Sequence, residues 1–190
     1  MDTLKGNIFL LLASFIWGTA FVAQATGMGH VGPLTFTFSR FFLGSLTIIP
    51  RILFFEKKIY FNTIKKTKTF LLIFFTGLSL ALGATTQQYA LLFADVSNAA
   101  FITALYVPLV PIILTIFFKK SLHWSIWCAV IICLVGLYLL TSESKSIKYK
   151  YSDIILIFSA IFFSIQIILT DVYIQKNNSP FTFAFTQYLI

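Results

Sequence analysis

Two short stretches in distant parts of the chain share one register: PLTFTFSRF at residues 33–41 and PFTFAFTQY at residues 180–188. Both follow the pattern Pro-x-Thr-Phe-x-Phe, which is better than the chance matching of two apolar segments. A second pair, IFLLLASF at residues 8–15 and IILIFSAI at residues 154–161, aligns once a one-residue gap is allowed. The matches indicate an internal repeat. Two unrelated hydrophobic hairpins that happen to align are the alternative.

The residues around these stretches are apolar over long distances. A membrane-spanning helix needs ~20 mostly apolar residues, and six segments meet this condition: 8–25, 33–54, 69–93, 97–118, 123–141 and 152–174. A seventh segment begins at Pro180, but the residues up to Ile190 would rise only about 16 Å as a helix. We therefore expect the chain to stop inside a membrane span.

Each repeat holds five spans, because the matched stretches lie 146–147 residues apart. An odd number of spans forces the second repeat into the opposite orientation, which is the inverted arrangement of many secondary transporters. We therefore expect one repeat at residues 1–145 and the start of a second at residues 146–190. A complete second repeat would carry the chain to roughly 290 residues and ten spans.

The composition agrees with a membrane protein. Of the 190 residues, 58% are hydrophobic and only 11% are charged, whereas soluble domains carry about 25% charged residues. A soluble core of this size could not hide so much apolar surface, so lipid must be the solvent for much of it. The net charge of +8 would suggest nucleic acid in a soluble protein. Here the basic residues lie in short runs between the spans, so we expect no nucleic-acid partner.

These basic runs predict the orientation. Three lysines fall on one side of the membrane (Lys145, Lys148 and Lys150), and ten basic residues fall on the other side together with the N-terminus: Lys5, Arg51, Lys57, Lys58, Lys65, Lys66, Lys68, Lys119, Lys120 and Lys176. By the positive-inside rule, the N-terminus is cytoplasmic and the chain is a multi-pass protein of the plasma membrane. A cleavable signal peptide ending near Ala25 is the alternative for the first span.

Polar side chains within the spans predict a solute cavity, because such groups normally face a bundle interior or water. In the first span Trp17, Phe21 and Gln24 share one helical face, and Phe163 and Gln166 share a face of the sixth span with Ser159 and Thr170. The repeat matches Trp17 with Phe163. The alternative role of these groups is ordinary hydrogen bonding between helices. The full set of cavity candidates is Trp17, Gln24, Arg40, Gln87, Thr103, Tyr106 and Gln166.

Three further features refine this set. Arg40 is the most costly group to bury in lipid and is either a structural anchor or a substrate contact. Gln87 and Gln88 point about 100° apart on a helix, so we expect only one of them to face inward. Pro108 and Pro111 predict a bend in the fourth span, which either shapes the cavity or serves packing.

No catalytic constellation or phosphate-binding motif is present. Cys128 and Cys133 lie on different faces of one helix, so neither a disulfide nor a metal site is implied. His30 and His123 fall at the edges of spans. We expect no metal, no cofactor and no enzymatic activity.

Five stretches carry a resemblance to a known family: residues 15–22 (FIWGTAFV), 33–42 including Arg40, 87–91 (QQYAL), 98–108 (NAAFITALYVP) and 136–140 (GLYLL). In their order and spacing they resemble the EamA-domain transporters of the drug/metabolite transporter (DMT) superfamily, over essentially all 190 residues, with residues 152–153 and Gln187 fitting the start of the second domain. The resemblance implies a ten-helix inverted-repeat transporter with a central cavity and alternating access.

Several features depart from that family's pattern. Lys119-Lys120 stands where many members carry a glutamate after the fourth span. The last three and a half spans are missing, which puts transport by this chain alone in question. The first span has no carboxylate, so the proton-coupling glutamate of the small multidrug-resistance relatives does not carry over.

The function we predict is secondary transport of small polar or amphipathic metabolites, such as amino-acid-like solutes or drugs, across the cytoplasmic membrane by alternating access. Membrane lipid and a small-molecule substrate are the expected partners. The alternatives are a truncated, non-transporting scaffold and a membrane-embedded enzyme acting on lipid-linked substrates. The enzyme would need acidic or histidine groups clustered at one interface, but the six carboxylates are dispersed. The sequence favours no particular substrate, direction, coupling ion or oligomeric state.

Overall fold

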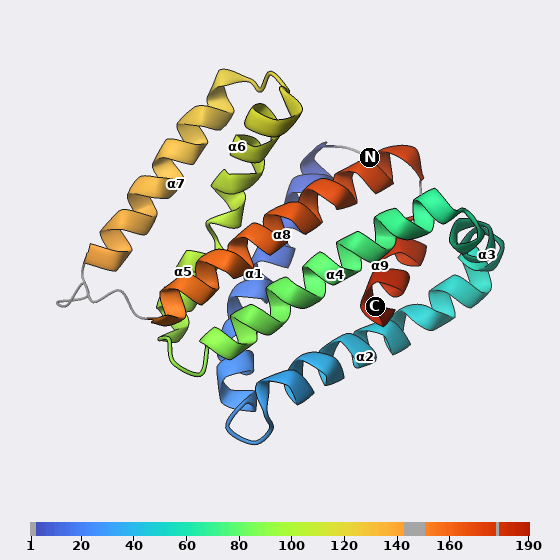
Figure 1. The fold of residues 1–190 in the computed structure, drawn as a ribbon, viewed down its shortest axis with the longest axis horizontal. Coiled ribbons are helices and arrows are strands. Elements are labelled where there is room, and N and C mark those ends of the chain that lie inside the picture. Colours follow the sequence, from blue (N-terminus) through green and yellow to red (C-terminus); the bar gives the residue numbers. More distant parts are fainter. Residues whose placement is uncertain (1–2, 143–150, 178) are drawn as a thin grey trace.

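The computed structural model describes residues 3–142, 151–177 and 179–190, which form helices with short connections and no strand. These helices form one bundle (Figure 1). In chain order the elements are α1 (Thr3–Gly27), α2 (Pro33–Arg51), the π-helical turn η1 (Ile52–Glu56), α3 (Lys57–Lys65), α4 (Thr67–Ala90), α5 (Val96–Thr103), α6 (Tyr106–Phe118), α7 (Trp124–Ser142), α8 (Tyr151–Lys176) and α9 (Pro180–Leu189).

The expected all-α, polytopic bundle is confirmed. Helices occupy all six expected spans and the start of the seventh. The expected fifth span corresponds to α7, whose apolar part within the described ranges, Trp124–Gly136, is shorter than a full span. The boundary expected between the repeats, at residues 145–146, lies outside the described residues. Over the part of the chain that the structure describes, five helical stretches are long and apolar enough to cross a membrane: Leu4–Gly27, Pro33–Lys65, Thr67–Ala90, Val96–Phe118 and Tyr151–Lys176.

The second span continues as a helix beyond its expected end at residue 54. The turn η1 leads directly into α3, so the helical backbone runs on to Lys65. Hydropathy falls at Lys57 and Lys58, whereas backbone hydrogen bonding can continue through charged residues. Helix α3 packs against α4, and its lysines suit a position at the membrane–water boundary.

Helices α4 and α8 lie side by side through the middle of the bundle and form its most extensive interface (Figure 1). Small residues allow the close approach. The Ser159 hydroxyl on α8 donates a 2.8 Å hydrogen bond to the backbone oxygen of Gly83 on α4, and both residues are buried. Because lipid tails supply no hydrophobic drive between helices, such packing and hydrogen bonds hold membrane helices together.

The fourth span is interrupted, and the interruption lies one turn before the position expected from its prolines. Helix α5 ends at Thr103 and α6 begins at Tyr106, whereas Pro111 lies inside the continuous helix α6. Pro108 is the third residue of α6, where a helix leaves its backbone N–H groups unpaired. The missing N–H of Pro108 is therefore tolerated there, and the chain turns at Ala104–Leu105 instead.

Helices that are equivalent in the proposed repeat run antiparallel to each other. At the start of α9, Thr182 bonds Glu56, which follows α2, and near the end of α9 the ring of Tyr188 lies 5.4 Å from that of Phe41 in the middle of α2. In helices α1 and α8, Phe21 of α1 packs against the buried cluster that contains Leu156 near the start of α8. Trp17, earlier on α1, and Phe163, later on α8, both contact Tyr106 of α6, so these two helices also run in opposite directions.

The outer faces of the bundle are strongly apolar. On α1, the side chains of Leu11 and Phe15 are 74% and 72% exposed. Helix α7 lies at one edge of the bundle (Figure 1). These faces have the character expected of surfaces that contact lipid.

Candidate functional site

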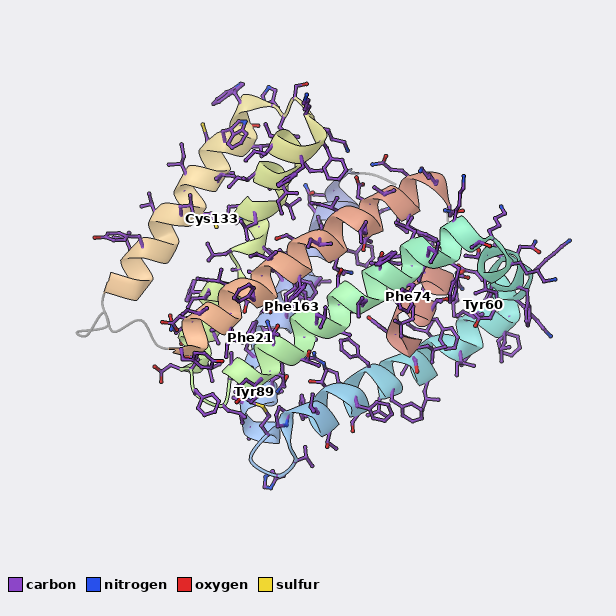
Figure 2. The ribbon with its side chains drawn as sticks, viewed as in Figure 1. Phe21, Tyr60, Phe74, Tyr89, Cys133 and Phe163 are labelled. Atoms are coloured by element: carbon purple, nitrogen blue, oxygen red, sulfur yellow. The ribbon has the colours of Figure 1, made fainter. Side chains whose placement is uncertain are left out.

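Aromatic side chains from three helices meet around Tyr106. The ring of Tyr106 on α6 lies 6.4 Å from that of Trp17 on α1 and 6.3 Å from that of Phe163 on α8, and both contacts are edge-on. Figure 2 labels Phe163 in the central part of the bundle. We call Trp17, Tyr106 and Phe163 the aromatic trio. Trp17 and Tyr106 are predicted cavity residues, and Phe163 is the residue that the repeat matches with Trp17.

Tyr106 owes its position to the interruption of the fourth span, because it is the first residue of α6. Its backbone oxygen accepts a long hydrogen bond of 3.5 Å from the hydroxyl of Ser164, the residue after Phe163. The turn at Ala104–Leu105 therefore presents Tyr106 to both α1 and α8. Trp17 keeps 63% of its surface exposed, so its indole has an open side as well as its contact with Tyr106.

Two more predicted site residues bond each other one turn away from the trio. The Gln87 amide on α4 donates a 3.2 Å hydrogen bond to the hydroxyl of Thr103, the last residue of α5, and both side chains are buried. Thr103 lies three residues before Tyr106, so this bond ties α4 to the segment that carries Tyr106. The pair gives the interior a polar group without a fixed charge.

A second polar group lies between α8 and α9. The amide nitrogen of Gln166 donates to the hydroxyl of Thr170 at 3.2 Å and to the side-chain oxygen of Gln187 at 3.4 Å. Gln187 is the repeat counterpart of Arg40 in the sequence alignment. Gln166 lies one helical turn beyond Phe163, so the aromatic trio and this amide pair share one stretch of α8.

Two buried glutamines have amide atoms without a hydrogen-bond partner among the residues that the structure describes. Gln24 donates to the backbone oxygen of Ala20 in its own helix at 3.1 Å, but its side-chain oxygen has no partner. Gln88 is fully buried, and neither end of its amide has a partner. An unsatisfied buried polar group costs about 1–3 kcal/mol, so these atoms are available to a solute or to water.

The expectation that only one of Gln87 and Gln88 faces inward is wrong, since their side chains are 6% and 0% exposed. Helix α4 contacts α2, α5, α8 and α9, so residues 100° apart on it can both be covered. Gln88 is the polar residue that sequence reasoning left out. Its signal was present in the sequence, as an uncharged polar group within an apolar span.

Arg40 lies in a different part of the bundle. Its guanidinium is 5.1 Å from the centre of the Phe41 ring, and that ring packs against Tyr188 of α9. The described contacts of Arg40 therefore belong to the packing of α2 on α9, which agrees with the anchor role. Its assignment as a substrate contact stays a prediction.

A separate surface hollow of about 340 Å³ is lined by Tyr89, Phe93, Tyr151 and Ser152. The ring of Phe93 lies 5.5 Å from that of Tyr89, and the hydroxyl of Ser152 is buried without a partner. None of these four residues belongs to the predicted cavity set. Over the ranges that the structure describes, no group of His, Cys, Asp and Glu residues could hold a metal ion.

A model of the EamA-like transporter family matches residues 4–142, which cover α1 to α7. The chain belongs to this family. The family resemblance seen in the sequence is thereby confirmed, and the family model covers residues 4–142 of this EamA chain.

Relatives of the chain are transporters by name. It is 29% identical over 97% of its length to an uncharacterized transporter of Archaeoglobus fulgidus, of which it covers 54%. It is 29% identical over 74% of its length to an S-adenosylmethionine uptake transporter of Rickettsia bellii, and 27% identical over the same share to that of Rickettsia conorii, covering 46% of each. The chain spans about half the length of these curated relatives. No solved structure matches it.

Proposed function

We propose that this chain forms part of a secondary transporter that moves small polar or amphipathic metabolites across the cytoplasmic membrane by alternating access. The observation that carries the proposal is the aromatic trio, in which Tyr106 lies between Trp17 and Phe163. In inverted-repeat transporters the substrate binds near the midplane, at the interface of the repeats. Trp17 and Phe163 are repeat equivalents on α1 and α8, so a residue that contacts both lies at that interface.

The antiparallel helix pairs support the inverted repeat. Phe41 and Tyr188 occupy equivalent positions, and their rings touch. Equivalent residues contact each other only near a twofold axis. We therefore assign residues 1–145 to the first repeat and residues 146–190 to the start of the second.

The chemistry of the interior suggests the class of solute. The aromatic trio offers flat apolar faces, and the glutamine amides offer donors and acceptors without a fixed charge. Such a site suits an amphipathic solute with a ring or an organic cation, since aromatic faces attract cations. S-adenosylmethionine, which has a purine ring and a sulfonium group, is the first compound to test because transporters of this compound are among the relatives.

For the orientation, we assign the basic end at α3 and the N-terminus to the cytoplasm. We assign transport, and no enzymatic activity, to the protein because its named relatives are transporters. Lipid around the apolar faces and the solute in the interior are its partners.

The test is uptake of labelled S-adenosylmethionine and of a panel of labelled amino acids by cells that express the protein, compared with cells that do not. The variant Phe163→Ala should reduce uptake at least about tenfold, because it removes one wall of the solute site. Phe158→Ala is the matched control, with the same change on the same helix at a side chain that is 55% exposed. Normal uptake by Phe163→Ala at normal membrane abundance would refute the site, and no uptake of any solute would favour the scaffold alternative.

A further inference from the structure

Several polar contacts join the family-matched unit, residues 4–142, to the helices that follow it, and two of them lie at opposite ends of the bundle. At one end of the bundle, the carboxylate of Glu56 accepts hydrogen bonds from the backbone N–H and the hydroxyl of Thr182 at 2.9 and 2.7 Å. At the other, the Asn98 amide on α5 donates a 3.0 Å hydrogen bond to the carboxylate of Asp153 on α8. We call these the Glu56 contact and the Asp153 contact.

The Glu56 contact takes the place of a missing helix cap. Ser179 precedes α9 in the capping position, but its side chain makes no capping bond, because its hydroxyl pairs with that of Tyr173 at 2.8 Å. A capping side chain normally bonds the N–H group of the second or third helical residue. Thr182 is the third residue of α9, and here Glu56 supplies the acceptor from the other side of the interface. A carboxylate at a helix N-terminus also interacts favourably with the helix dipole.

The two contacts lie about one membrane thickness apart. Asp153 is the third residue of α8, and Tyr173, which pairs with the residue that precedes α9, lies twenty residues further along the same helix. That separation is about 30 Å at 1.5 Å per residue and equals the hydrocarbon thickness of a bilayer. Phe163 of the aromatic trio is halfway between them, ten residues from each.

We propose that the Glu56 contact and the Asp153 contact are the two gates of the solute site, one at each side of the membrane. When one repeat rocks against the other around a central site, contacts between the repeats separate at one end while those at the other end close. Both contacts join elements of the two proposed repeats, and both are made in this structure. This inference rests on the proposed transport function and assigns the regulation of access to its site.

The test measures access to the site from each side of the membrane. Cys128 and Cys133 are replaced by alanine, and Ser164→Cys, next to Phe163, becomes the single reporter. A membrane-impermeant maleimide is applied to intact cells and, separately, to inside-out vesicles. Thr182→Val weakens the Glu56 contact by one hydrogen bond, and Asn98→Ala removes the Asp153 contact. Membrane abundance is measured for every variant, and Glu56→Gln gives a milder change at the first gate.

Each variant has a matched control. Thr186→Val makes the same change on α9, where the hydroxyl donates a 2.8 Å hydrogen bond to the backbone oxygen of Thr182, one turn earlier in the same helix. Asn177→Ala makes the same change at an amide that bonds the backbone oxygen of Tyr173 in its own segment.

Thr182→Val should raise the labelling rate at least about tenfold from one side only, because a hydrogen bond to a charged group is worth that factor. Asn98→Ala should raise it from the opposite side only, and neither control should change it. Increases from the same side, increases no larger than those of the controls, or no increase at all would overturn the gates. Labelling requires no solute, so opposite-sided labelling without any uptake would refute the proposed function and leave the gates standing. Normal uptake with unchanged labelling would support the proposed function and refute the gates.

Discussion

The variant Gly83→Ala tests how closely the two central helices must approach. A Cβ atom at residue 83 would lie 3.2 Å from two ring carbons of Phe163 and 3.4 Å from the Cβ of Phe162. Carbon atoms pack best at about 3.5–4.0 Å, so α4 and α8 would have to separate by a few tenths of an ångström. The Ser159 bond to the Gly83 oxygen, at 2.8 Å, opposes that separation.

The net effect on stability follows from two opposing terms. Alanine favours a helix over glycine by about 1 kcal/mol, whereas overpacking a well-filled interface costs about 1–3 kcal/mol. Since the clash involves a ring that is also held by Tyr106, we expect a net loss of about 1 kcal/mol. The displaced Phe163 should also reduce transport.

Thermal unfolding in detergent measures the first effect, and uptake measures the second. Gly18→Ala is the control, because a Cβ on Gly18 of α1 would have nothing within 4 Å, so only the helix-favouring term applies. If Gly83→Ala raises the unfolding temperature as much as Gly18→Ala does, the reasoning about the α4–α8 interface is refuted.

Three further predictions concern the buried polar groups and the orientation. Gln88→Leu should raise the free energy of unfolding by about 1 kcal/mol in thermal unfolding, because it removes two unpaired buried atoms. It should also lower uptake if the amide contacts the solute. A loss of stability would show that the amide has hydrogen-bond partners. Ser159→Ala should lower the free energy of unfolding by about 1 kcal/mol in the same assay. Ser14→Ala, at an exposed hydroxyl that bonds within α1, should leave it unchanged. Equal effects would contradict a special role for Ser159. A single cysteine at exposed Ser97 should react with an impermeant reagent added to intact cells, and one at Lys57 should not; equal labelling would refute the orientation.

The positions of the apolar helices could be predicted from the sequence, because hydropathy over ~20 residues is a property of the segment itself. Six full spans were expected, and over the described residues five helices are long and apolar enough to cross a membrane. The end of the second span could not, since η1 and α3 continue the helix through Lys57 and Lys58 where the hydropathy signal stops. The bend of the fourth span was predicted from Pro108 and Pro111. Its exact place depends on which N–H groups the helix start leaves unpaired, and the turn falls at Ala104–Leu105.

The polar faces of the site could be predicted only in part. Helical spacing grouped residues along one helix, and the repeat matched Trp17 with Phe163, and both groupings stay predictions. Spacing cannot say which residue of a third helix lies between them, because that depends on how the helices cross. Tyr106 was a candidate for its chemistry, and its contacts with both partners come from the turn before α6.

Glu56 shows the same limit for the charged residues. In the sequence it stands among basic residues at the end of a span and reads as part of a solvated loop. Its role depends on α9, which is 126 residues away in the chain, and on the engagement of the Ser179 hydroxyl with Tyr173. A capping bond between distant segments leaves no local sequence pattern, because the pattern of a cap is defined within one helix.

Phe41 and Tyr188 lead to a last prediction, about where the two repeats pivot. Their rings are 5.4 Å apart, and they are equivalent positions of α2 and α9, so they lie close to the proposed twofold axis. Positions near the pivot of a rocking motion change their separation least, whereas Glu56 and Thr182, at one end of the bundle, change it most. A short bifunctional thiol reagent that links cysteines at 41 and 188 should therefore leave uptake largely intact, and one that links cysteines at 56 and 182 should block it. Uptake is measured before and after linking and after cleavage of the linker. If the link between 41 and 188 blocks uptake as completely as the link between 56 and 182, the repeats do not pivot at that contact.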